Sequence, residues 1–403
     1  MLSAFAKCPS LLRNISKIEF KIWNPRLGPQ PIKAPVLNRH STPIISAFLR
    51  NIPHMPRLQS AGFAGIKVEQ EHLALLFQSN TLHDLILFRC SLPRSVRLPP
   101  SPVRHLTLSL RDNCKHVEPL LGHCSANLET LEFTGHLSHL PGSTRFPLFP
   151  KLRELKFYET SESINDLNTL ISRAPQLEHL ELYGRRNLLS RLSALPVSIT
   201  RLTINRHAIG DGDFAGRFIQ LPHLHVTHYH NKKDVDDRRG LVIPIIQRIF
   251  PDLTSLDLNI LWDFRNFALL IARHLPNVTQ LKLRISWPSA YDLDIGPYLP
   301  HFAAPEGPLA RLYVDLDTAN KIHIETCKSW VIHVVLGLDP GLGGPYLQEV
   351  EMIFSNSRSS VVLETNGKGG RLQSIQRNEE RMLWAYSHGQ VYEGPYVGDR
   401  DFR

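Results

Sequence analysis

The sequence predicts an α/β solenoid in which short parallel strands form one curved sheet, with helices and loops on its outer side. Three observations support this fold: a Leu-x-x-Leu-x-Leu pattern that recurs, a nearly constant spacing, and helix-like segments between the copies. Clear copies occupy residues 152–157, 177–182, 253–258 and 278–283, each with a proline two residues before it. Repetition at this period, with one strand per unit, is the signature of leucine-rich repeats.

The first apolar position of each copy defines the register. These positions are Ile15, Leu58, Leu82, Val103, Leu128, Leu152, Leu177, Ile199, Leu221, Leu253, Val278, Leu309 and Leu347. From Leu58 onward, successive spacings are 24, 21, 25, 24, 25, 22, 22, 32, 25, 31 and 38 residues. Most lie within the roughly 20–29 residues of leucine-rich repeats, a regularity that scattered strands of an ordinary α/β domain would not keep. Because a solenoid can extend over any length as one unit, we expect one cooperative array.

The chain is expected to divide into three parts. Residues 1–57 would form a basic N-terminal repeat end with a proline-rich spacer, 58–363 the leucine-rich-repeat solenoid, and 364–403 a C-terminal cap or tail. Up to residue 58, nine Lys and Arg residues against one Glu supply +8 of the net charge of +9. The pattern Ile15-x-x-Ile18-x-Phe20 predicts a repeat strand there, which favours a repeat over a mitochondrial transit peptide.

Helices are predicted between strands wherever apolar residues recur at helical spacing. The first two candidates are 44–49 and 69–79. Ser163-x-x-Asp166 resembles a capping box at the start of a third helix, which would end before Pro175. A similar segment covers 264–275, and beyond Val314 the repeats become irregular, with glycine-rich loops at 339–345 and 366–370.

Composition and motifs narrow the function classes. Five cysteines without a CxxC pair indicate free thiols, and therefore an intracellular protein of the cytoplasm or nucleus. No apolar run reaches the roughly 20 residues of a membrane span. Phosphate-binding loops, nucleophile elbows, HExxH and kinase signatures are absent, so we expect no enzyme and no cofactor, and a metal- or nucleotide-dependent enzyme is the disfavoured alternative. Basic residues do not cluster with aromatic ones, so nucleic acid is not the expected partner.

A histidine cluster at the ninth copy offers one candidate for metal binding. It comprises His223, His225, His228 and His230. Strand alternation places His223 and His225 on the exposed face, where two imidazoles can share a zinc ion. Polar strand surface is the simpler interpretation, and we expect no metal here.

The third, fifth and seventh positions of each copy project from the open, concave face of the sheet. They include short polar residues such as Ser109, Thr203 and Asn205. As a set they form a polar surface dotted with aromatic residues, the kind that solenoids use to bind proteins. The candidate partner-binding residues are Glu132, Glu154, Lys156, Tyr158, His179, Glu181, Tyr183, Arg201, His223, His225, Asp257, Lys282, Arg284 and Arg311.

Charge divides this predicted face into two zones. Glu132, Glu154 and Glu181 dominate three adjacent strands. Basic residues lie further along, at Arg201, Lys282, Arg284 and Arg311. Tyr158 and Tyr183, beside the acidic zone, are the expected anchors, because tyrosine is over-represented at interface hot spots.

Two phrases carry a resemblance to a known family: Leu152-Arg153-Glu154-Leu155-Lys156-Phe157 and Arg173-Ala174-Pro175-Gln176-Leu177. Over residues 50–350 the chain resembles the repeat region of fungal F-box and leucine-rich-repeat proteins. In that family an F-box docks on the adaptor of a cullin-RING ubiquitin ligase, and the repeats select substrates. The Leu-Pro-x-Glu start of an F-box is not found here, so the cullin adaptor is an expected partner only if an F-box is missing from this sequence. The alternative is a free-standing leucine-rich-repeat scaffold with no ligase link.

Overall fold

A computed structural model gives the structure of the chain, which folds into two compact units. The first comprises residues 1–202 and 207–212, and the second comprises 203–206 and 213–403. The structure describes residues 9–21, 41–93, 98, 101–109, 117–135, 146–159, 164–184, 188–189, 192, 195–205, 221–227, 242–260, 275, 277–287, 311–318, 349–354, 359–365, 370–375, 381–387 and 390–395.

The first unit is built on seven parallel strands. They are β1 (Lys17–Lys21), β2 (Ser60–Ala64), β3 (Asp84–Phe88), β4 (His105–Ser109), β5 (Thr130–Gly135), β6 (Glu154–Glu159) and β7 (His179–Tyr183). Each strand pairs with the next one along the chain. The register aligns Leu131, Leu155 and Leu180, the fourth positions of three successive copies. The predicted α/β leucine-rich-repeat fold is therefore confirmed, and the N-terminal pattern at Ile18 and Phe20 belongs to β1 as expected.

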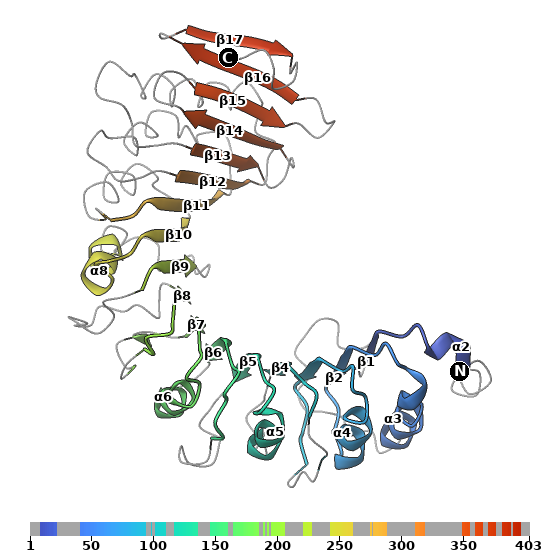
Figure 1. Ribbon diagram of the computed structural model, residues 1–403. Helices are drawn as coiled ribbons and strands as arrows, with labels where there is room; N and C mark the ends of the chain where they lie inside the picture. The colour runs from blue at the N-terminus through green and yellow to red at the C-terminus, as the bar shows by residue number, and fades with distance from the viewer. Residues whose placement is uncertain are drawn as a thin grey trace. The chain divides into compact units, whose positions relative to one another are not determined.

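Helical segments precede or connect the strands of the first unit. They are α2 (Pro9–Leu12), α3 (Ser41–Leu49), the 3-10 turn η1 (Ile52–His54), α4 (Gln70–Leu76), α5 (Val117–Cys124) and α6 (Ile164–Ser172). Figure 1 shows α3, α4, α5 and α6 along the same side of the sheet. Helices α3 and α4 confirm the two predicted near residues 44–49 and 69–79. Ser163 lies outside the described residues, so its capping role stays a prediction.

Leucines and phenylalanines fill the space between strands and helices. Leu155, Phe157, Leu180 and Leu182, at the fourth and sixth positions of two copies, are 0% exposed. The Phe133 and Phe157 rings stack across β5 and β6 with centroids 5.8 Å apart. Burying one such side chain contributes about 1.5–3 kcal/mol, so the repeated core explains why the pattern recurs.

Proline before a copy starts a tight turn into the strand. The Leu152 N–H donates to the Phe149 carbonyl, and the Leu177 N–H donates to the Ala174 carbonyl at 3.1 Å. Proline thus occupies the second turn position, where its fixed φ is favourable and no N–H is needed.

Strand starts are locked together by shared carbonyls. The N–H groups of Glu178 and His179 both donate to the Arg153 carbonyl at 2.9 Å. The second unit repeats this arrangement, with Thr279 and Gln280 both donating to Thr254. The third position therefore falls at the first residue of each strand, and the open-face side chains keep one register.

The second unit continues the repeat with β9 (His223–Thr227), β10 (Ser255–Ile260), β11 (Gln280–Trp287), β12 (Arg311–Thr318) and β13 (Glu349–Phe354). Neighbours along the chain pair in parallel. Strand β8 (Arg201–Asn205) falls at the division between the units. Helix α8 (Val242–Ile249) was not predicted, although Val242, Ile245, Ile246 and Ile249 recur at helical spacing. The predicted helix at 264–275 lies almost entirely outside the described residues.

The end of the chain changes direction at every strand. β14 (Ser359–Thr365), β15 (Gly370–Ile375), β16 (Arg381–Ser387) and β17 (Gln390–Pro395) follow β13 in antiparallel order. Parallel strands need a crossover of about a dozen residues or more. The strands from β13 to β17 instead follow one another closely along the chain and pair antiparallel, a feature that the leucine pattern does not reveal. The predicted domain limits at 58 and 363 remain predictions.

Three open-face expectations fail. Ser109, Thr203 and Asn205 are 9%, 5% and 5% exposed, although alternation assigns them to the polar face. Alternation determines the direction of a side chain and not what covers it.

Of the cysteines, Cys90 and Cys124 are described, and both are buried and form no disulfide. Among the described residues, no helix combines the length and apolar character that crossing a membrane requires.

Candidate functional site

Three rows of side chains cross β5, β6 and β7 on the face away from the helices, which we call the β5–β7 face. The third-position row is Thr130, Glu154 and His179. The fifth-position row is Glu132, Lys156 and Glu181. The seventh-position row is Thr134, Tyr158 and Tyr183. All nine are half-buried, so the face holds its side chains in place while leaving part of each in contact with solvent.

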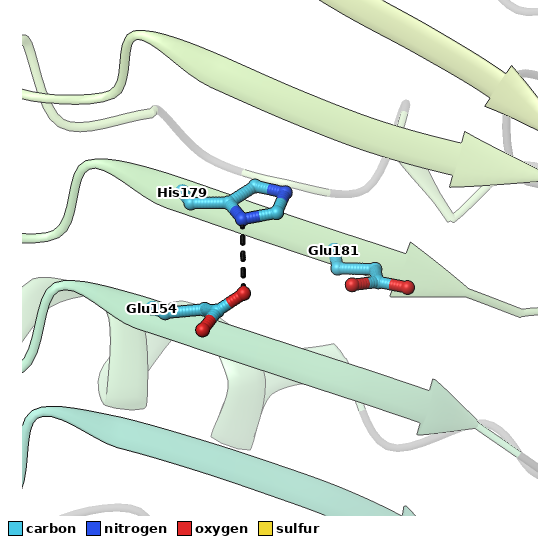
Figure 2. Close-up of side chains that lie close together, drawn as sticks. All are labelled: Glu154, His179 and Glu181. Carbon is cyan, nitrogen blue, oxygen red and sulfur yellow. Dashed lines mark hydrogen bonds and ion pairs between the residues drawn. The ribbon is translucent and has the colours of Figure 1, made fainter.

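The third-position row is a hydrogen-bonded chain centred on Glu154. Thr130 Oγ1 donates to Glu154 Oε2 at 3.4 Å, and His179 Nδ1 lies 3.1 Å from Glu154 Oε1 (Figure 2). Burial lowers the pKa of His179, and this outweighs the opposite effect of Glu154 and Glu181. At neutral pH the imidazole is therefore uncharged and satisfies Glu154 by donating from Nδ1.

The fifth-position row places an ammonium group between two carboxylates. Lys156 Nζ lies 3.4 Å from Glu154 Oε1 and 3.8 Å from Glu181 Oε2. Glu132, on the other side of Lys156, makes no hydrogen bond or ion pair with the described residues. Three carboxylates against one ammonium leave two net negative charges on the face.

The seventh-position row carries a stacked tyrosine pair. The Tyr158 and Tyr183 rings are 4.7 Å apart between centroids and 1° from parallel. This separation matches the strand spacing of about 4.8 Å, so the stack follows directly from the register. Tyr158 Oη donates to Glu181 Oε1 at 3.5 Å. Burial first, and then Glu181, Glu132 and Glu154, raise the pKa of Tyr158 to about 12, which keeps the phenol neutral.

A cation could be held by part of this face. Glu154, His179 and Glu181 each offer a ligand atom, and these atoms lie within 4.8 Å of one another (Figure 2). Neutral imidazole and carboxylates are ordinary metal ligands. However, Lys156 already places its positive charge beside both carboxylates. We therefore assign the group to an ion-pair network that orders the face.

The candidate residues of the second unit form a sparser arrangement. His225 Nε2 lies 3.8 Å from Asp257 Oδ2, His223 is exposed, and Lys282 is half-buried. His228 and His230 lie outside the described residues, so the predicted histidine cluster is covered only in part. Arg284 and Arg311 belong to β11 and β12, where the description covers their backbone alone. The predicted basic zone stays a prediction.

The acidic zone differs in one respect from the expectation. Lys156 lies inside it, and Glu154 and Glu181 contact neighbouring side chains. Within the part of the chain that the structure describes, Glu132 is the one carboxylate of the three without a hydrogen bond or ion pair. Arg201 is exposed at the start of β8 and contributes to lowering the pKa of His179. The repeat register alone places Lys156 between Glu132 and Glu181. The sequence therefore contained enough information to predict this ion pairing, although the charge zones did not include it.

Comparisons with known proteins found a similar solved structure but no matching family or curated protein. Neither a protein-family model nor a curated protein matches the sequence. Among solved structures, a match is the leucine-rich repeat-containing protein LegL7 from Legionella pneumophila. It is 13% identical, with a TM-score of 0.41, and the match covers 84% of this chain and 91% of that one. The comparisons do not support membership of the fungal F-box family, whereas the strand register and core define a leucine-rich-repeat fold.

Proposed function

We propose that this chain binds another protein through the β5–β7 face and has no catalytic role. The observation that carries the proposal is the parallel Tyr158–Tyr183 stack, half-buried and bordered by Glu181. Tyrosine is enriched among the residues that dominate binding energy. Side chains already ordered by their neighbours also lose less conformational freedom when a partner binds.

Fixed charges around the stack support specificity. Unlike a solvated strand surface, this face links Glu154, Lys156, His179 and Glu181 into one network. Complementary charges at an interface mainly set partner choice and association rate.

The test is affinity purification with mass spectrometry from cells expressing the tagged full chain. We expect Tyr158→Ala with Tyr183→Ala to remove partners that the wild-type chain recovers. Gln78→Ala and Arg173→Ala change exposed residues on the helix side and serve as controls. Circular dichroism and melting temperature should be unchanged in all variants. Retention of the partner set by the tyrosine variant, together with its loss in the controls, would place the interface on the helix side and refute the proposal.

The finer role that the repeat phrases suggest is substrate recognition for a ubiquitin ligase. It rests on the resemblance of 152–157 and 173–177 to F-box proteins. The alternative is a free-standing scaffold. Coexpression with the cullin-ligase adaptor separates the two, because stoichiometric recovery with residues 1–403 would support a ligase role. Since no F-box start is found in these residues, we expect the adaptor not to be recovered.

An intracellular location fits this function. Cys90 and Cys124 are free thiols within the repeat core, and burial raises the pKa of Cys124 to about 12. Such thiols persist where the environment is reducing. Fluorescence microscopy of the tagged full chain would distinguish cytoplasm from nucleus, and secretion of the tagged chain would contradict this proposal.

A further inference from the structure

The seventh-position row continues across five strands, with aromatic side chains at both ends and short polar side chains in the middle. It runs through Phe88, Ser109, Thr134, Tyr158 and Tyr183 on β3 to β7. Neighbouring strands are about 4.8 Å apart, the distance that separates stacked planar groups. Thr134 therefore occupies the position of a third ring in the Tyr158–Tyr183 stack, and its side chain is too short to cover the face of Tyr158.

The molecule already stacks a guanidinium group on an aromatic ring of this row. The Arg89 guanidinium carbon lies 5.0 Å from the centroid of the Phe88 ring. Arg89 has a φ of 53°, and its N–H donates to the Ser109 carbonyl at 2.6 Å. The left-handed backbone after β3 thus coincides with an arginine–aromatic contact at the other end of the row.

The charge near Tyr158 indicates which kind of group could bind on the ring face that Thr134 does not cover. Glu132 precedes Thr134 by two residues on the same side of β5, a distance of roughly 7 Å along the strand. It makes no hydrogen bond or ion pair with the described residues. Its negative charge contributes to raising the pKa of Tyr158, which shows that the carboxylate and the phenol are within electrostatic reach. A planar cation over Thr134 would meet a ring on one side and a carboxylate nearby.

We propose that this position receives an arginine side chain of the partner protein, stacked on Tyr158 above Thr134 and paired with Glu132. This inference rests on the proposed function and names the chemistry of the partner. Arginine suits the site better than lysine, because its planar group stacks on aromatic faces and pairs with carboxylates through two hydrogen bonds. The preferred partner is thus an arginine-containing segment of another protein.

The test uses three synthetic peptides that differ at one central residue. That residue is arginine, lysine or citrulline, which is planar like arginine but neutral, and the flanking residues are glycine and serine. Binding to the full chain is measured by fluorescence anisotropy at fixed salt. We expect the arginine peptide to bind about tenfold more tightly than either of the others, as loss of stacking or of charge pairing predicts.

Variants locate the binding site. Tyr158→Ala should weaken binding of the arginine peptide about tenfold, and Glu132→Gln up to about fivefold. Thr134→Tyr should abolish binding by filling the position. Tyr158→Phe keeps the ring and should retain binding, and Glu178→Gln, which removes an exposed carboxylate beside the face, is the matched control.

Two outcomes would overturn the inference. One is equal binding of the arginine and lysine peptides with no effect of Tyr158→Ala. The other is self-association of the chain in sedimentation experiments that Tyr158→Ala abolishes, without peptide selectivity, because a second copy would then occupy the face. If partner capture is lost in the tyrosine variant while the peptides are not discriminated, the proposed function stands and the arginine assignment fails.

Discussion

The two units share one repeat design but differ in what their open faces carry. In both, the fourth and sixth positions are buried and aligned: Leu180 and Leu182 are 0% exposed, and Leu256 and Leu258 are 1% and 3% exposed. On the open face of β5–β7, ion pairs, hydrogen bonds and a ring stack connect neighbouring strands. On the open face of β9–β11 the described contacts are longer: His225 Nε2 lies 3.8 Å from Asp257 Oδ2, and Thr227 Oγ1 donates to the Ile204 carbonyl at 3.4 Å.

This difference separates the residues that determine the fold from those that determine recognition. The core positions must be apolar in every copy, because each unit buries its leucines only against neighbouring copies. The third, fifth and seventh positions are free of that requirement. A leucine-rich-repeat chain can therefore concentrate ordered polar and aromatic groups on a few strands without altering its framework.

The largest effect is expected where the two units are alike. Leu180→Asp and Leu256→Asp should each cost several kcal/mol, because an unpaired charge replaces a buried side chain. Urea denaturation followed by far-UV circular dichroism measures the loss. Arg153→Asp, at an exposed second position, is the control and should have little effect. An unchanged melting temperature for Leu180→Asp would show that the repeat register is wrong.

The next effect should distinguish the units. Tyr158→Ala with Tyr183→Ala is expected to weaken partner binding about tenfold to a hundredfold, the range of interface hot spots. His223→Ala with His225→Ala, on the second unit, should leave the affinity unchanged. Surface plasmon resonance with the captured partner gives both values. The opposite ranking would assign the interface to the second unit.

A smaller effect should appear in the pH dependence of stability. Because burial lowers the pKa of His179 below its usual 6.5, the folded chain binds protons there less readily than the unfolded chain. The contribution of neutral His179 to the free energy of unfolding is therefore fully present above pH 6.5 and is lost as the pH falls below 6.5. His179→Gln should make the decrease shallower between pH 7 and pH 5, measured by urea denaturation.

The smallest effect should come from the long His225–Asp257 contact on the second unit. Asp257→Asn removes the charge facing His225, and a half-exposed pair at 3.8 Å contributes at most about 1 kcal/mol. Urea denaturation at low and high salt should therefore give nearly the same stability for variant and wild type. A loss well above that amount would mean that the second unit's open face is ordered more strongly than its contacts indicate.

Much of the framework could be predicted from sequence because it depends on local pattern. The leucine register placed Leu131, Leu155 and Leu180 side by side, and prolines marked turns such as the one before Leu177. The site was predicted as a set of positions, and its chemistry only in part. The neutral state of His179 depends on burial, and so does the fixed position of the Tyr158 ring. Strand alternation does not predict burial. For the same reason, alternation wrongly predicted that Ser109, Thr203 and Asn205 would be exposed.

Hydroxyl-radical footprinting of the purified complex tests whether a partner contacts the β5–β7 face. Tyr158 and Tyr183 are half-buried on that face. Tyr313, a half-buried tyrosine on β12 at the fifth position of its repeat copy, is the internal reference for oxidation. Oxidation of each residue is measured by mass spectrometry with and without the captured partner. We expect protection of Tyr158 and Tyr183 and an unchanged oxidation rate at Tyr313. Protection of Tyr313 with unchanged oxidation of Tyr158 and Tyr183 would contradict this expectation.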